Sequence, residues 1–208
     1  MHKTTNTVGG GQVGAVAFRK AGLITIGLLV GAMGCATMSQ SGSGGAPVEK
    51  YSATVQVGSG AGQGNVPVII TIRSYTSDAE AAQLVQTLRT QGPDGLVDVM
   101  RKLDGKGNFA PAMAMSQELK VIRAVKTPNG RQLRMLLDRP IGFLEGRIGA
   151  RTLTYQVGII VINLDANGKG DGQMIVAARP SFDKNNELVI EKFDFEPVLL
   201  KDIAPLLN

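Results

Sequence analysis

The chain has 208 residues, 22 of them basic and 17 acidic, with one cysteine, one histidine and no tryptophan. The histidine, His2, and three of the basic residues precede the cysteine, Cys35. The part from Cys35 onward therefore keeps 19 basic and all 17 acidic residues, a net charge of +2. A charge this small gives no reason to expect nucleic acid as a partner. Because this part lacks histidine and a second cysteine, it excludes Ser-His-Asp and Cys-His catalysis, His- or thiolate-bound zinc and an internal disulfide, and we expect no enzyme, no metal and no cofactor.

Residues 1–34 are typical of a secretory signal, because basic residues precede a short apolar run at 23–30. A membrane-spanning helix needs about 20 apolar residues, so a single-span anchor or ordinary secretion is the alternative. The segment Ala32-Met33-Gly34-Cys35 resembles the lipobox of bacterial lipoproteins. The resemblance implies that Cys35 is acylated, for example with palmitate, and becomes the mature N-terminus. Since the next residue is Ala36 rather than aspartate, the resemblance also implies sorting to the outer membrane of the cell envelope, facing the periplasm.

Residues 35–49 are predicted to be the lipidated cysteine and a flexible tether, because the segment is rich in glycine and serine. Thirteen such residues span about 20 Å on average. Residues 50–208 have the length of one globular domain with its own core.

The first elements of this domain are predicted to be a hairpin and two helices. Residues 51–57 and 66–73 alternate or are β-branched on either side of a glycine-rich loop, which favours a β-hairpin. Ser77 and Glu80 form a capping-box pattern, and apolar residues then recur at helical spacing, which predicts a helix over about 77–91. Pro93 follows Gly92 and favours a second, shorter helix over about 93–104.

Three further hairpins are predicted after the helices. Residues 119–125 and 132–137 flank Asn129-Gly130, a strong hairpin signal, and two more pairs of strands follow at 153–164 with 172–178 and at 181–182 with 187–195. Successive hairpins favour an α+β fold: a single domain with a meandering antiparallel sheet of about seven or eight strands and the two helices packed on one of its faces.

Two loops are candidate sites. In the first, Asp165, Asn167 and Gly170 match positions of a calcium loop, but Lys169 stands where a ligand is needed, so a plain hairpin turn is favoured. In the second, charges stand among glycines and apolar residues. A structural ion pair between Arg139 and Glu145 is favoured, and the alternatives are an anion-binding pocket or a catalytic site with Glu145 as acid or base. The pocket candidates are Arg139, Glu145, Arg147, Arg151 and Tyr155.

The stretch from Asp138-Arg139-Pro140-Ile141 through Tyr155 and Leu164-Asp165 to Ile190-Glu191 and Pro197-Val198 resembles a recurring type of uncharacterised secreted bacterial lipoprotein. The resemblance covers most of the domain from about Tyr51. Its shared residues belong to turns and core, so the resemblance implies a fold but no activity and no catalytic residue.

Three hypotheses of function follow. The first is a membrane-tethered envelope lipoprotein that acts as a binding or structural module with an envelope protein as its partner. The second is a carrier of an apolar ligand in a cavity lined by Met113, Met115 and Phe143. The third is a hydrolase that uses paired carboxylates, for which the chain has few aromatic sugar platforms. The sequence names neither the ligand nor the oligomeric state.

Overall fold

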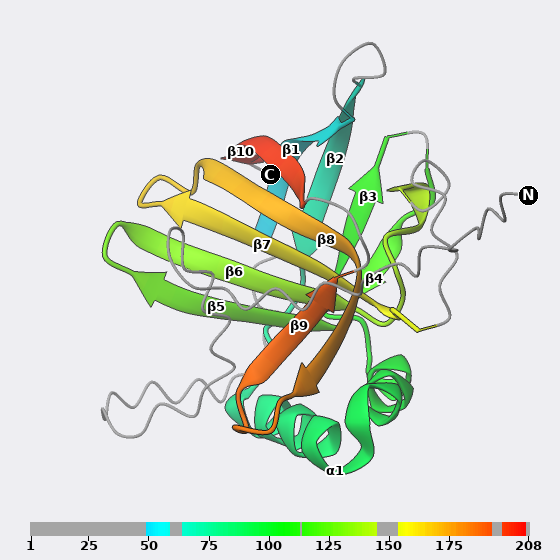
Figure 1. Ribbon diagram of the computed structural model, residues 1–208. Coiled ribbons are helices and arrows are strands. Elements are labelled where there is room, and N and C mark those ends of the chain that lie inside the picture. Colours follow the sequence, from blue (N-terminus) through cyan, green and yellow to red (C-terminus); the bar gives the residue numbers. More distant parts are fainter. Residues whose placement is uncertain (1–48, 59–63, 113, 145–153, 193–196, 207–208) are drawn as a thin grey trace, which may run out of the picture.

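A computed structural model describes residues 49–58, 64–112, 114–144, 154–192 and 197–206. Within these ranges the chain forms ten strands and one helix (Figure 1). In chain order they are β1 (Glu49–Val57), β2 (Gly64–Ile72), α1 (Asp78–Lys102), β3 (Gly107–Pro111), β4 (Gln117–Leu119), β5 (Val121–Thr127), β6 (Gly130–Leu137), β7 (Val157–Asp165), β8 (Gly170–Phe182), β9 (Leu188–Lys192) and β10 (Val198–Pro205).

The strands form one nearly closed, antiparallel, barrel-like sheet. Nine strands follow each other in the order β4-β3-β2-β1-β10-β8-β7-β6-β5, and β9 pairs with β8 beside this path. The structure is mostly β, with 55% in strands, so the expected α+β class with two helices packed on one face of a sheet is wrong. The four expected hairpins are present as β1–β2, β5–β6, β7–β8 and β8–β9.

Strands that the sequence analysis did not predict close this sheet into a barrel. The C-terminal strand β10 pairs with both β1 and β8 and thereby joins the first hairpin to the later ones. The short strands β3 and β4 extend the sheet beyond β2. A sheet that curls back on itself has no open inner face for helices to cover, which is why the two-layer expectation fails.

The two ends of the sheet meet at a seam. Strands β4 and β5 are separated in the chain by Lys120 alone, whose backbone N–H donates to the carbonyl of Leu136 over 2.9 Å. Thr76 continues the seam: its N–H donates to the carbonyl of Ile122, and its hydroxyl accepts from the N–H of the same residue. Both Thr76 and Lys120 are buried, so the barrel is shut where β4 meets the beginning of β5.

Apolar side chains fill the barrel interior. Along β6, Leu133, Met135 and Leu137 point inward, and they meet Ile160 and Ile162 of β7. All five side chains are 0% exposed, so none of them borders a cavity large enough for a water molecule. This is the alternation expected of a small barrel whose core is solid.

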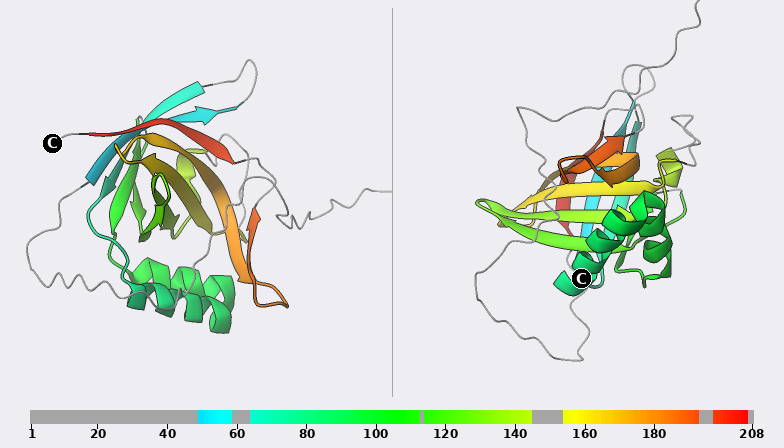
Figure 2. Two further views of the ribbon diagram at one scale, coloured as in Figure 1. Left: turned by 90° about the vertical axis from the view of Figure 1, so that its left-hand side faces the viewer. Right: turned by 60° about the horizontal axis from the view of Figure 1, so that its bottom comes forward.

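Helix α1 packs on the outside of the barrel, over β5 to β8 (Figure 2). It begins at the expected capping box, in which the Glu80 N–H donates to the Ser77 hydroxyl and the Ser77 N–H donates to the Glu80 carboxylate. The expected break between two helical segments occurs at Gly92, whose φ of 71° and ψ of −171° are non-helical, so α1 is one element with a kink at this residue. What was wrong is the packing of the two helices on one face of a two-layer sheet. Among the described residues, no helix combines the length and apolar character needed to cross a bilayer.

Candidate functional site

One end of the barrel gathers polar side chains and is called the barrel mouth below. The strand register places the β5–β6 turn beside the β7–β8 turn, because Gly130 is paired with Asp165. The start of β1 lies at the same end, since Gly170 is paired with Ile203 and Tyr51 with Pro205. Figure 1 shows the two turns side by side at the left of the barrel.

A network of hydrogen bonds centred on Glu49 crosses the barrel mouth. The guanidinium of Arg131, on β6, donates to the Glu49 carboxylate over 2.5 Å and also to the hydroxyls of Tyr51 and Tyr75. Both tyrosine hydroxyls donate to the same carboxylate, over 2.7 and 2.8 Å. Arg131 points inward in register with Leu133 and Met135, so the network closes the end of the apolar interior.

The network shifts the titration of its members. Burial raises the pKa of the Glu49 carboxyl, but the hydrogen bonds from Arg131 and the two tyrosines outweigh burial and hold it below its ordinary value. Burial and the neighbouring Glu49 carboxylate raise the pKa of Tyr51 to about 12, and the same two causes raise the pKa of Tyr75. At neutral pH the network therefore consists of one carboxylate, one guanidinium and two neutral hydroxyls.

Beside this network lies an open hollow of about 400 Å³. It is lined by Lys126, Thr127, Gly130, Arg131, Asp165, Ala166 and Gly168. Lys126 is exposed, and no carboxylate of a described residue lies within ion-pairing distance of its ammonium group. The acidic residue in the lining is Asp165, and Arg131 is paired with Glu49, so the ammonium of Lys126 is the charge that the hollow offers to an anionic group.

The calcium-loop candidate is a hairpin turn that stabilises itself. The Asp165 carboxylate accepts the backbone N–H groups of Asn167 and Lys169 over 2.8 and 2.9 Å, and these bonds lower its pKa. One oxygen of this carboxylate, Oδ1, accepts both bonds of the turn, and Gly168 supplies the positive φ, 75°, that the turn needs. No group of three or more potential metal ligands occurs among the residues that the structure describes.

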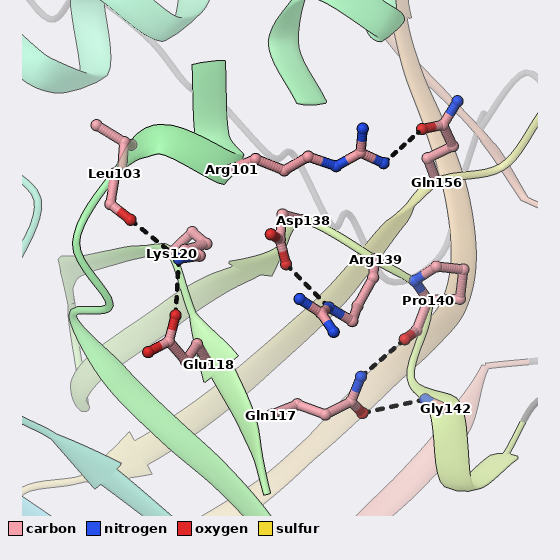
Figure 3. Close-up of polar contacts among 10 residues, drawn as sticks. All are labelled: Arg101, Leu103, Gln117, Glu118, Lys120, Asp138, Arg139, Pro140, Gly142 and Gln156. Carbon is pink, nitrogen blue, oxygen red and sulfur yellow. Dashed lines mark hydrogen bonds and ion pairs between the residues drawn. The ribbon is translucent and has the colours of Figure 1, made fainter. Parts of the chain in front are cut away.

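The second predicted site lies at the opposite end of the barrel. Of its candidates, Glu145, Arg147 and Arg151 lie outside the described residues, as does Cys35. The guanidinium of Arg139 is mostly exposed and approaches the buried carboxylate of its neighbour Asp138, at 3.3 Å (Figure 3). Tyr155 is half-buried in the segment before β7.

The residues around Arg139 cover this end of the barrel. Ile141 and Leu144 are almost completely buried, and Phe143 contacts Phe109 of β3 with ring centroids 6.0 Å apart. The amide of Gln117 fixes the segment, because it donates to the Pro140 carbonyl and accepts from the Gly142 N–H, both over 3.0 Å (Figure 3). The described part of the predicted site thus closes the core.

A buried lysine joins this end of the barrel to the helix. The ammonium of Lys120 donates to the Leu103 carbonyl, just after α1, over 2.9 Å and to the Glu118 carboxylate over 2.7 Å (Figure 3). Beside it, Arg101 reaches Gln156, whose amide in turn reaches Asp94. Each of these groups has a protein partner, so the arrangement holds the helix against the seam.

The sequence analysis did not predict the barrel mouth. One signal was present: Arg131 stands two residues before Leu133 in a strand whose alternate residues are apolar, so strict alternation would have placed this cation inside the barrel. Its partners Glu49 and Tyr75 are remote in sequence, and only the closure of the barrel brings them together.

No protein family, curated protein or solved structure matches this chain.

Proposed function

We propose that this protein is an envelope lipoprotein whose barrel domain is a binding module, and that the domain binds its partner at the barrel mouth. The observation that carries the proposal is the hollow beside Arg131, where Lys126 provides a positive charge without a carboxylate partner among the described residues. The opposite end is covered by Ile141 and Leu144, which leaves the mouth as the polar, open end of the barrel.

A binding module is favoured over a carrier of an apolar ligand. Carriers built on barrels need a central cavity, but the inward side chains of β6 and β7 are completely buried against each other. Of the residues expected to line such a cavity, Met115 is 89% exposed, Phe143 packs against the core and Met113 lies outside the described residues.

The position of the mouth is consistent with a tether. The described chain begins at Glu49, which itself belongs to the mouth network. A lipid on Cys35, joined through a glycine- and serine-rich segment that spans about 20 Å, would therefore keep the mouth close to the membrane surface. A partner that lies on or passes along the membrane meets this end of the barrel first.

Two experiments test the proposal. Intact mass spectrometry of protein extracted from membranes, beside a Cys35→Ala variant, should show a mature chain that starts at an acylated cysteine; an unmodified chain would refute the tether. For the binding site, a photoreactive amino acid is placed at Thr127 of the mouth or, as a control, at the exposed Gln56 on the other end of β1. Crosslinked adducts in living cells should form from position 127 and not from 56, and the reverse pattern would refute the site.

A further inference from the structure

Strand β5 has a free edge beside the barrel mouth. It pairs on one side with β6, and it is the last strand of the sheet on the other side. At the beginning of this edge, Thr76 forms hydrogen bonds with both the N–H and the C=O of Ile122. Beyond that point Ala124, Val125, Lys126 and Thr127 are all exposed.

The backbone of this edge has unused donors and acceptors. In an antiparallel strand, alternate residues direct their N–H and C=O groups to opposite sides. Ile122 bonds away from β6, toward Thr76, so Ala124 and Lys126 also direct their backbone groups away from β6. Within the described part of the chain, no hydrogen bond reaches these four groups.

The charge of the edge indicates what kind of strand fits. The inward face of the strand carries Lys126 directly opposite Arg131, and the hollow of the mouth lies beside both. A second copy of β5 would bring another Lys126 to the same face, and like charges on paired strands are destabilising. An anionic lipid headgroup would satisfy the ammonium, but it does not carry donors and acceptors spaced along a line as a strand does. An extended segment would pair with the N–H and C=O groups of both residues at once.

We propose that β5 accepts an extended segment of an acidic partner protein, which adds a strand to the barrel through Ala124 and Lys126 and places a carboxylate against Lys126. This inference rests on the proposed function and names the class of partner. Main-chain hydrogen bonds supply the affinity in strand addition, and side-chain contacts supply the specificity. Here the specificity is a carboxylate in the hollow.

The test uses the full chain in detergent and a labelled synthetic peptide, acetyl-Thr-Val-Glu-Val-Thr-Val-amide. Fluorescence anisotropy measures binding, and hydrogen–deuterium exchange locates it. We expect saturable binding and slower exchange in the segment 123–127. A Lys126→Glu variant should bind the peptide about fivefold more weakly, as expected for an exposed ion pair, and it should bind a peptide with lysine in place of glutamate more tightly than the unsubstituted chain does.

Two controls separate strand addition from other modes of binding. A peptide N-methylated on the edge that would face β5 keeps its carboxylate but loses its backbone donors, and it should not bind. Equal binding of the methylated peptide, or protection outside residues 123–127, overturns the inference. So does displacement of the peptide by short-chain phosphatidylglycerol, which would make Lys126 a headgroup site. If any of these results occurs while crosslinked adducts still form from position 127 in cells, the proposed binding site stands and only strand addition is refuted.

Discussion

Replacing Arg131 by methionine tests whether the mouth network stabilises the barrel. The substitution keeps an unbranched side chain of similar reach but removes the donor groups to Glu49, Tyr51 and Tyr75. The side chains of Arg131 and Glu49 are 36% and 28% exposed, so the pair lies between an exposed ion pair, worth about 0 to 1 kcal/mol, and a buried one, whose disruption costs about 3 to 5 kcal/mol. A hydrogen bond to a charged group contributes about 1.5 to 3 kcal/mol.

We therefore expect Arg131→Met to lower the free energy of unfolding by about 2 kcal/mol, which for a domain of this size lowers Tm by roughly 4 to 8 °C. Urea and thermal unfolding followed by circular dichroism measure both quantities. Arg101→Met is the control, because Arg101 is 54% exposed and its bonds to Asp98, at 3.4 Å, and Gln156, at 3.2 Å, are both exposed. It should change the stability by less than about 1 kcal/mol.

The pH dependence of this difference checks its cause. The folded-state pKa of Glu49 lies below its ordinary value of 4.5, so the unfolded chain binds the proton more readily. The stabilisation is therefore complete above pH 4.5 and is lost as the pH falls through the folded-state pKa. The difference in the free energy of unfolding between the unsubstituted chain and Arg131→Met should become smaller in that acid range. A difference that is absent at pH 7, or that acid does not change, would refute the reasoning.

Three further predictions concern the scaffold. Ser77→Ala removes the cap of α1 and should cost about 1 kcal/mol in urea unfolding, whereas Thr90→Ala on the same helix should cost less; equal costs would contradict the capping role. Gly170→Ala should prevent folding or lower the free energy of unfolding by several kcal/mol, because its Cβ would lie 1.8 Å from a carbonyl oxygen of β7. Gly168→Ala has 3.6 Å of space but a positive φ, so it should lower the same quantity by about 1 to 2 kcal/mol. The opposite order would contradict the strand register. Leu133→Ala, at a completely buried position, should cost about 3 kcal/mol, and a cost below about 1 kcal/mol would show that the interior is loosely packed.

Local sequence signals predicted the local structure correctly. Asn129-Gly130 marks the β5–β6 turn, where Gly130 has a φ of 154° and is paired with Thr127. The Ser77 and Glu80 pattern marks the start of α1, and both hydrogen bonds of the capping box are formed. Such signals work because the turn and the cap are decided by residues a few positions apart.

The closure of the barrel could not be predicted in the same way. Strand β10 has Asp202 with a φ of 54°, and the pairing register shifts near it with both neighbours, so the alternation of side chains is interrupted. Strand β3 begins with Gly107 and ends with Pro111, two residue types that disfavour strands. The choice of β1 as the neighbour of β10 joins residues about 150 positions apart, and no local pattern encodes it.

The outer face of the barrel has no comparable candidate for a binding site among the described residues. Helix α1 covers the outer face of β5 to β8, and no other described helix covers the outer face of β10, β1, β2, β3 and β4. The exposed apolar residues of that face, Ile69 at 46% and Leu199 at 40%, stand on strands separated by β1, and single apolar residues of this kind are ordinary on protein surfaces. At the mouth, by contrast, Lys126 has no ion-pair partner and the β5 edge no strand partner among the described residues, and both lie beside the hollow between the β5–β6 and β7–β8 turns. Because these three features together suit a carboxylate on an extended chain, they are the reason that we propose the mouth as the binding site.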